Sequence, residues 1–211
     1  MMNSNSEAAL IKVFVQGDNG VGKTSLINQY VNKRINSRYI LTIGADYASR
    51  KLQIDDKLVC LQIWDTPGHE SCQSLGKGFY KGADCCVLVY DVSVMKSFES
   101  LKTWHLDFLQ QLDPAEPEAF PFIVVGNKVD VDRGQSRVVT EESAREWCKW
   151  NGMLHFETSA KYDINLDEAF FCVAQEAIKF AAVKSDQDSV RGWESESESE
   201  SESGSESEQS E

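Results

Sequence analysis

A glycine-rich segment near the N-terminus has the residue types and spacing of a phosphate-binding loop. Residues 17–24 read Gly-Asp-Asn-Gly-Val-Gly-Lys-Thr and match the pattern G-x-x-x-x-G-K-[ST] at every fixed position. Glycines let backbone N–H groups approach phosphate oxygens, and the following helix directs the positive end of its dipole at the same anion. Lys23 is expected to pair with the β and γ phosphates, and the Thr24 hydroxyl to ligate Mg²⁺. The expected phosphate-site residues are Asp18, Asn19, Gly20, Val21, Gly22, Lys23, Thr24 and Ser25.

A second acidic element follows the apolar run that ends at Trp64. Asp65 is succeeded by Thr-Pro-Gly at residues 66–68. Beside a phosphate loop, a carboxylate that leaves a buried strand is more often a magnesium ligand than a helix cap, commonly through a water. We therefore expect Asp65 to hold Mg²⁺ and the N–H of Gly68 to contact the γ-phosphate.

Two polar loops further along the chain predict which base is bound. They read Asn-Lys-Val-Asp at 127–130 and Thr-Ser-Ala-Lys at 158–161. A carboxylate at Asp130 can accept hydrogen bonds from the ring N–H and exocyclic amine of guanine, which adenine does not present in that arrangement. The N–H of Ala160 can donate to the guanine carbonyl, and the stems of the two lysines can lie over the base. The predicted guanine-site residues are Asn127, Lys128, Asp130, Ser159, Ala160 and Lys161.

The elements that carry these loops alternate between buried strands and amphipathic helices. Apolar runs predict strands at 11–15, 58–64, 85–91, 122–126 and 153–158, and a three- and four-residue spacing predicts helices within 98–112 and 166–177. Residues 45–54 and 58–64 are joined only by 55–57, too short for a crossover, which predicts an antiparallel hairpin. The predicted fold is therefore α/β, with a mostly parallel six-stranded sheet, one antiparallel edge strand and helices on both faces. Ligands of such sheets bind at the carboxyl ends of the strands.

Composition narrows the classes of function. The chain has 211 residues, with 21 Lys plus Arg against 34 Asp plus Glu and a net charge of -13. This charge argues against a broad grip on nucleic acid, and no apolar run approaches the ~20 residues of a membrane span. The N-terminus does not read as a signal peptide. Six cysteines show no metal-binding spacing and are expected to be reduced thiols.

Together these motifs resemble the P-loop small GTPases of the Ras superfamily, and more narrowly the Rab family, with the greatest likeness to its late-endosomal and lysosomal subgroup. The likeness runs from about Ile11 to Ala182 and covers GDNGVGKTSL, NQYVNKR, TIGADY, QIWDTPGHE, GADCCVLVYDV, FPFIVVGNKVD and FETSAK. It implies a monomeric switch that binds GTP or GDP with Mg²⁺ and hydrolyses GTP. It also implies exchange factors, activating proteins and effectors of Rab type, and a cytoplasmic protein that associates peripherally with late-endosomal and lysosomal membranes to regulate vesicle traffic.

The resemblance assigns roles to further residues. Thr42 matches the residue that ligates Mg²⁺ only when the γ-phosphate is present, and Tyr39 matches the aromatic residue that flanks the nucleotide. Tyr47, Trp64 and Phe79 match an exposed aromatic triad that effectors contact, while ordinary sheet packing explains them equally well. The loops that touch the γ-phosphate would be ordered by GTP and relax after hydrolysis. The implied magnesium ligands are Thr24, Thr42 and Asp65.

The sequence departs from the family in the loop after Asp65. His69 stands where the family has the Gln that orients the attacking water, and Pro67 replaces a small residue, fixing φ and removing an N–H. Intrinsic hydrolysis is therefore expected to be slow, with Lys23, Gly68 and His69 as the catalytic residues. Activating proteins supply groups in trans that accelerate such reactions by ~10³ to 10⁵. Ser71-Cys72 also replaces the family's Arg-Phe, which alters the expected effector face.

The end of the chain is compositionally distinct. Residues 193–211 contain eight Glu and no Lys or Arg, and Ser-x-x-Glu recurs, which suits acid-directed kinases, although a solvated flank is the simpler interpretation. We expect a flexible segment at 1–10, a GTPase domain at 11–182 and a disordered acidic tail at 183–211. The last cysteine is Cys172, so we expect membrane association by recruitment rather than by prenylation.

Two classes of function stay open. One is a cycling GTPase; the other is a non-cycling, GTP-bound cytosolic scaffold, or pseudo-GTPase, that presents one state to its partners. His69 and Pro67 favour the scaffold, whereas the complete set of nucleotide motifs favours the cycling enzyme. A P-loop kinase of small metabolites is disfavoured because Asp130 and Ala160 provide guanine recognition and no acceptor site is visible.

Overall fold

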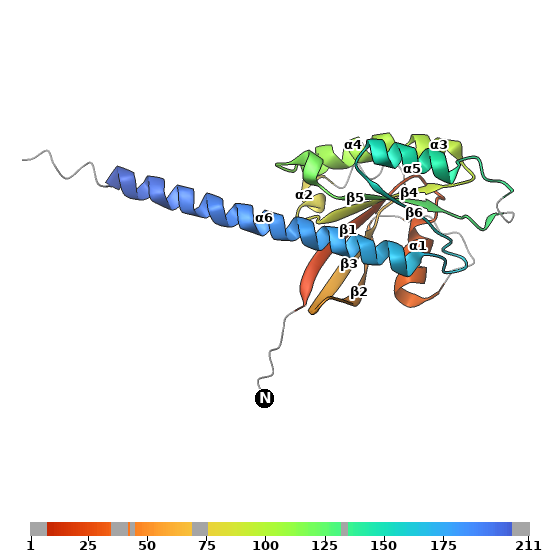
Figure 1. Cartoon of the computed structure of the whole chain (residues 1–211), viewed down its shortest axis with the longest axis horizontal. Coiled ribbons are helices and arrows are strands. Elements are labelled where there is room, and N and C mark those ends of the chain that lie inside the picture. The colour runs from red at the N-terminus through yellow and green to blue at the C-terminus, as the bar shows by residue number, and fades with distance from the viewer. Residues whose placement is uncertain (1–7, 35–41, 43–44, 69–75, 132–134, 204–211) are drawn as a thin grey trace, which may run out of the picture.

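A single mixed β-sheet forms the centre of the molecule in the computed structural model, which describes residues 8–34, 42, 45–68, 76–131 and 135–203 (Figure 1). Its strands are β1 (Ala9–Gln16), β2 (Asp46–Ile54), β3 (Lys57–Asp65), β4 (Cys85–Asp91), β5 (Phe122–Asn127) and β6 (Leu154–Glu157). They lie in the order β2-β3-β1-β4-β5-β6. Only β2 runs antiparallel to its neighbour within the described sheet. The predicted six-stranded sheet with one antiparallel edge strand is confirmed.

Helices cover both faces of the sheet, as predicted. They are α1 (Lys23–Asn32), α2 (Lys77–Tyr80), α3 (Met95–Glu99), α4 (Leu101–Leu112), α5 (Glu141–Trp150), α6 (Leu166–Ser203) and the short 3₁₀ helix η2 (Pro117–Ala119). Side chains alternate between the faces of β1, so Val13 and Val15 pack in the core beneath α1 and α6. Phe14 points the other way, into the core beneath α2, α4 and α5. Figure 1 shows the two helical layers on opposite sides of the strands.

Two helical regions differ from the prediction. The pattern from Phe98 to Leu112 is divided, because α3 ends at Glu99 and α4 begins at Leu101. Helix α5 was not predicted at all, although its start carries a recognisable signal. Thr140 accepts a hydrogen bond from the Ser143 N–H at 3.2 Å, and two glutamates occupy the first turn.

Helix α6 continues to Ser203, whereas the sequence predicts disorder from residue 183. A helix that is already nucleated by packing extends at little cost, and Glu favours helix, so the Ser-Glu repeat prolongs it. The predictions for residues 1–7 and 204–211 lie outside the described residues. Nowhere in the described helices is there a stretch both long and apolar enough to cross a membrane.

The cysteines of the described chain are unbridged thiols. They are Cys60, Cys85, Cys86, Cys148 and Cys172. Burial raises the pKa of Cys148 to about 12 and raises those of Cys85 and Cys86 further, so these thiols stay protonated. Among the residues described, no three His, Cys, Asp or Glu side chains gather in a way that could hold a metal ion.

His155 makes the stability of the fold sensitive to acid. Its Nε2 lies 3.1 Å from the Tyr90 hydroxyl, its Nδ1 is buried with no hydrogen-bond partner in the described chain, and burial lowers its pKa from 6.5 to about 4. Between these two pKa values, His155 is protonated in the unfolded chain but neutral in the folded chain. We expect the free energy of unfolding to fall as pH drops from about 6.5 toward 4.

Urea unfolding at several pH values, comparing the wild type with His155→Phe, measures this dependence. The variant should show a shallower loss of stability over the same range. It should keep the smaller contribution of His105, whose pKa burial also lowers. Parallel curves for the two proteins would show that His155 is not the titrating group.

Candidate active site

The phosphate loop, residues 17–22, joins β1 to α1 at the carboxyl edge of the sheet. Gly17, Gly20 and Gly22 have φ values of 144°, 81° and 102°, which side chains rarely adopt. A Cβ on Gly22 would lie 2.4 Å from the Asn127 amide nitrogen, and one on Gly17 would lie 2.2 Å from the Val89 carbonyl oxygen. Glycine is thus required by close packing against β4 and β5 as well as by backbone conformation.

Lys23 directs its ammonium group into this loop. The Nζ donates to the Gly17 carbonyl at 2.7 Å and to the Asp18 carbonyl at 3.0 Å, and the residue is 6% exposed. A buried cation surrounded by loop backbone is the arrangement that receives a phosphate. The structure therefore brings Lys23 and the loop together as the sequence predicts.

Three oxygen-bearing side chains converge beside the loop. The Thr24 hydroxyl donates to Asp65 Oδ2 at 2.6 Å and lies 3.0 Å from the Thr42 hydroxyl. Asp65 is 7% exposed, and its Oδ1 has no hydrogen-bond partner in the described structure. Burial raises the Asp65 pKa, opposed by the Thr24 hydrogen bond and the Lys23 charge. An unsatisfied buried carboxylate oxygen among hydroxyl donors fits Mg²⁺, which prefers oxygen ligands and retains waters and phosphate oxygens.

The segment after Asp65 approaches the loop closely. A Cβ on Gly68 would lie 2.4 Å from the Asn19 nitrogen, 2.5 Å from the Asp18 carbonyl carbon and 2.6 Å from the Lys23 Nζ. The Thr66 hydroxyl donates to the Val15 carbonyl at 2.7 Å and holds this segment to β1. Only a glycine fits at position 68, where its backbone can face a phosphate. Tyr39 and His69 lie outside the described residues, so their roles stay predictions.

Asn127 joins the phosphate loop to the base loops. Its Nδ2 donates to the Val21 carbonyl at 2.9 Å, and its Oδ1 accepts from the Thr158 hydroxyl at 3.3 Å and from the Ala160 N–H at 3.2 Å. The Ser159 hydroxyl donates to Asp130 Oδ1 and orients that carboxylate. The two predicted base loops therefore lie together. The Ala160 N–H, predicted to donate to guanine, here donates to Asn127.

Lys128 spans the same junction. Its Nζ donates to the Gly20 carbonyl and pairs with Asp91 Oδ2 at 2.7 Å. Burial opposes ionisation of Asp91, but the hydrogen bonds from Lys128 and Ser93 outweigh it and lower the Asp91 pKa. Sequence reasoning missed Asp91. The sequence feature that could have identified Asp91 is the one that identified Asp65, namely a carboxylate at the end of a buried strand.

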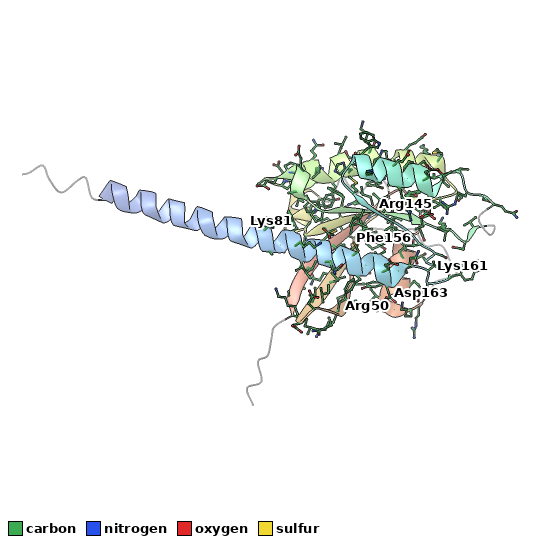
Figure 2. All side chains as sticks on the ribbon, in the orientation of Figure 1. Arg50, Lys81, Arg145, Phe156, Lys161 and Asp163 are labelled. Carbon is green, nitrogen blue, oxygen red and sulfur yellow. The ribbon has the colours of Figure 1, made fainter. Side chains whose placement is uncertain are left out.

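A charge cluster ties the base loops to α1. The Lys33 ammonium lies 2.9 Å from Asp163 and 3.2 Å from Asp167, and Arg50 Nη1 lies 2.8 Å from Asp167. In Figure 2, Lys161 and Asp163 lie beside the start of α6. Because these groups are largely exposed, the cluster contributes little to stability. It joins the end of α1 and strand β2 to the start of α6.

The predicted effector triad forms one aromatic cluster. The Trp64 ring centroid lies 5.2 Å from that of Tyr47 and 5.2 Å from that of Phe79. Tyr47 is 54% exposed, whereas Trp64 and Phe79 pack partly against the core. The Lys12 Nζ lies 4.9 Å from the Trp64 centroid and donates to the Phe79 carbonyl at 2.8 Å. The cluster is both a packing element and a partly exposed surface.

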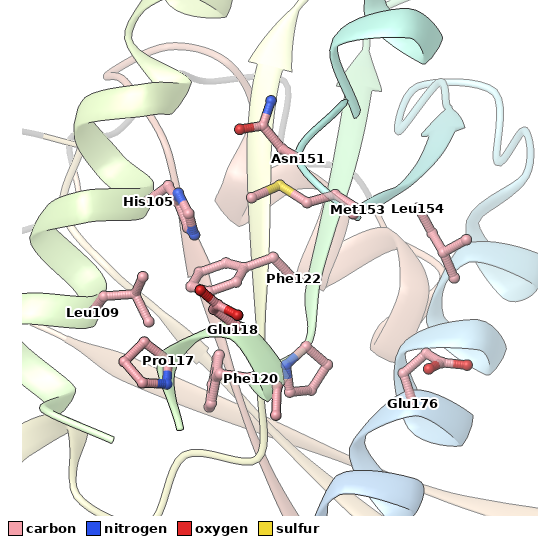
Figure 3. A pocket seen from close by; sticks show the side chains of 13 residues that line it. His105, Leu109, Pro117, Glu118, Phe120, Phe122, Asn151, Met153, Leu154 and Glu176 are labelled. Carbon is pink, nitrogen blue, oxygen red and sulfur yellow. The ribbon is translucent and has the colours of Figure 1, made fainter. Parts of the chain in front are cut away.

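A separate cavity of about 370 Å³ lies at the opposite end of β5 and β6 (Figure 3). It is lined by Phe122, Met153 and Leu154, at or next to the amino ends of these strands, and by His105, whose ring meets Phe122 edge-on at 4.4 Å. None of the predicted site residues lines it. The predicted phosphate-loop and base-loop residues lie instead at the carboxyl edge of the sheet.

A phosphate loop, an oxygen-donor set for magnesium and two guanine-type loops on one edge of this sheet define a small GTPase. Residues 12–179 match the Ras family model. The chain is 61% identical to Ras-related protein Rab7 of Glycine max over 170 residues, 80% of this chain and 82% of that protein. It is 58% identical to Ras-related protein RABG3b of Arabidopsis thaliana over 186 residues, 88% of this chain and 90% of that protein.

The chain therefore belongs to the Ras family and, within it, to the Rab GTPases of the Rab7 subgroup, which act in endosomal and vacuolar membrane traffic. It binds GTP and GDP with Mg²⁺ and hydrolyses GTP to GDP and phosphate. Its family implies exchange factors, activating proteins and effectors as partners.

The magnesium site can be tested with Thr24→Val, which removes the hydroxyl and keeps the shape of the side chain. We expect the Mg²⁺ concentration that half-maximally slows GDP release to rise about 10- to 100-fold. Thr103→Val, the same change at an exposed position of α4, is the matched control and should leave this concentration unchanged. An unchanged value in Thr24→Val would remove Thr24 from the metal site.

Proposed function

We propose that this chain is a Rab-type switch of the endosome-to-lysosome route whose intrinsic GTP hydrolysis is slow. The observation that carries the switch is the contact between Thr24, Asp65 and Thr42. These three oxygens come from the phosphate loop, the end of β3 and the segment between α1 and β2. A ligand that binds all three joins that segment to the sheet, and a ligand that binds only two releases it.

Each residue of the site has a defined task in hydrolysis. Lys23 stabilises the charge that develops on the β and γ phosphates, and the Gly68 N–H donates to a γ-phosphate oxygen. Thr24, Asp65 and Thr42 would hold Mg²⁺, which when bound would neutralise negative charge on the phosphates. Water attacks the γ-phosphorus, the bond from phosphorus to the β–γ bridging oxygen breaks, and the electron pair leaves on GDP. The proton of the attacking water ends on the released phosphate. Asp130, oriented by Ser159, keeps guanine in place throughout.

The proposed slow rate of intrinsic GTP hydrolysis follows from the residues on either side of Gly68. Pro67 is buried, has a fixed φ and lacks an N–H, so the segment that carries the water-orienting residue has less freedom. At His69, an imidazole ring has a different reach from the family's glutamine. These features also support the second candidate, a GTP-bound scaffold that does not cycle. Both candidates use the same nucleotide site and differ only in the hydrolysis rate.

The surface that partners read is proposed to be the aromatic cluster of Tyr47, Trp64 and Phe79. It lies on β2, β3 and α2, on either side of the segment that follows Asp65. Its supporting observation is the exposed Tyr47 ring packed on the half-buried ring of Trp64, which in turn packs on the half-buried ring of Phe79. A change in that segment can therefore reach the cluster through Trp64, next to Asp65.

Single-turnover hydrolysis tests the proposal. Protein loaded with GTP and Mg²⁺ is followed by chromatography, with and without a Rab-type activating domain. We expect slow conversion alone and acceleration by the activating domain. His69→Gln should raise the intrinsic rate at least about tenfold by restoring an amide that orients water.

The same substitution at a remote position, His105→Gln in α4, is the matched control and should leave the rate unchanged. No conversion under either condition, with GTP tightly bound, would establish the scaffold instead. Equal rates in the wild type and His69→Gln would show that His69 does not limit hydrolysis.

A further inference from the structure

Trp104 connects helix α4 to the phosphate loop. Its indole Nε1 donates to Asp18 Oδ1 at 2.7 Å, across 86 residues of sequence. A hydrogen bond to an ionised carboxylate is stronger than a neutral one. The indole ring packs against the core beneath α4. Its N–H therefore attaches the loop to a helix whose position the core fixes, since Leu101 and Phe108 of α4 are 0% and 2% exposed.

Asp18 is the loop residue on which the phosphate-facing groups converge. Its carbonyl oxygen accepts from the Lys23 Nζ at 3.0 Å. Its carbonyl carbon lies 2.5 Å from the place that a Cβ on Gly68 would occupy. The backbone of Asp18 thus touches both the cation for the β and γ phosphates and the segment that meets the γ-phosphate. Whatever holds the Asp18 side chain also sets the position of this backbone.

We propose that Trp104 is a positioning residue that, through Asp18, sets how tightly the GTP state is held relative to the GDP state. The proposal rests on the nucleotide site described above. Without the hydrogen bond from the indole, the Asp18 side chain is no longer held to α4. The Asp18 backbone, which contacts Lys23 and the Gly68 segment, is then positioned less firmly. GDP lacks the γ-phosphate to which the Gly68 N–H is proposed to donate, so GTP binding suffers more than GDP binding. A change in the position of helix α4 would then alter how firmly the phosphate loop is held.

Trp104→Phe separates this role from packing, because phenylalanine keeps an aromatic ring and removes the N–H donor. Dissociation rates of fluorescent GTP and GDP analogues are measured for both proteins. We expect GTP release to accelerate about tenfold and GDP release by less than about threefold. Trp150→Phe in α5 is the matched control, since Trp150 is 89% exposed, and should change neither rate.

Asp18 variants complete the cycle. Asp18→Ala should also accelerate GTP release more than GDP release. Asp18→Asn should show a smaller acceleration, because its amide oxygen still accepts the hydrogen bond. The double variant Trp104→Phe/Asp18→Ala should release GTP no faster than Asp18→Ala alone. Equal acceleration of GTP and GDP release in Trp104→Phe would show a merely structural role and overturn the proposal. A wild type that binds neither analogue would instead refute the nucleotide site itself.

A second measurement is made on the wild type and uses the variant only to assign one resonance. The chain has five tryptophans, and the indole N–H resonance that Trp104→Phe removes from the spectrum of isotope-labelled protein belongs to Trp104. This resonance should differ between the GDP form and the form with a non-hydrolysable GTP analogue, because the Asp18 bond tightens in the latter. An identical chemical shift in both forms would overturn the proposal.

Discussion

The arrangement of the site depends on one buried amide. Asn127 is 1% exposed, and its side chain makes three hydrogen bonds, to the Val21 carbonyl, the Thr158 hydroxyl and the Ala160 N–H. The phosphate loop and both base loops thus share one rigid point. If any of these partners moved, a buried polar group would lose its hydrogen bond, which would cost stability. The three loops are therefore held in one relative position.

The sheet places that amide where it can act. In the register of the parallel strands, Asp91 lies opposite Asn127. Val15 likewise lies opposite Asp65. The carboxyl ends of β1 and β3 therefore lie side by side, as do those of β4 and β5, and the loops that leave these four strands lie at one edge of the sheet. A slip by one residue in any strand would turn its functional side chain to the other face. The alternation of hydrophobic side chains that buries Val13 and Phe14 on opposite faces also determines the direction in which the functional side chains at the strand ends point.

Much of this was predictable from sequence because the signals are local. The phosphate loop, the base loops and the hairpin of β2 and β3 each lie within a short segment whose residue types dictate their geometry. The bond from Trp104 to Asp18 and the pair of Lys128 with Asp91 were missed because they join distant residues and leave no spacing pattern. Helix α6 exceeds its prediction because composition indicates disorder, while a helix nucleated by packing continues through favourable residues. Helix α5 was missed although its Thr140 cap was visible.

The most direct test of this account is the affinity of Asn127→Ala for GDP and for IDP, which lacks the exocyclic amine that Asp130 is proposed to read. If Asn127 is the joint between the loops, both affinities should fall by the same large factor, about a hundredfold or more, and the preference for GDP over IDP should be unchanged. A loss confined to GDP, or a collapsed preference, would show that Asn127 reads the base, and would contradict the claim that it holds the loops together.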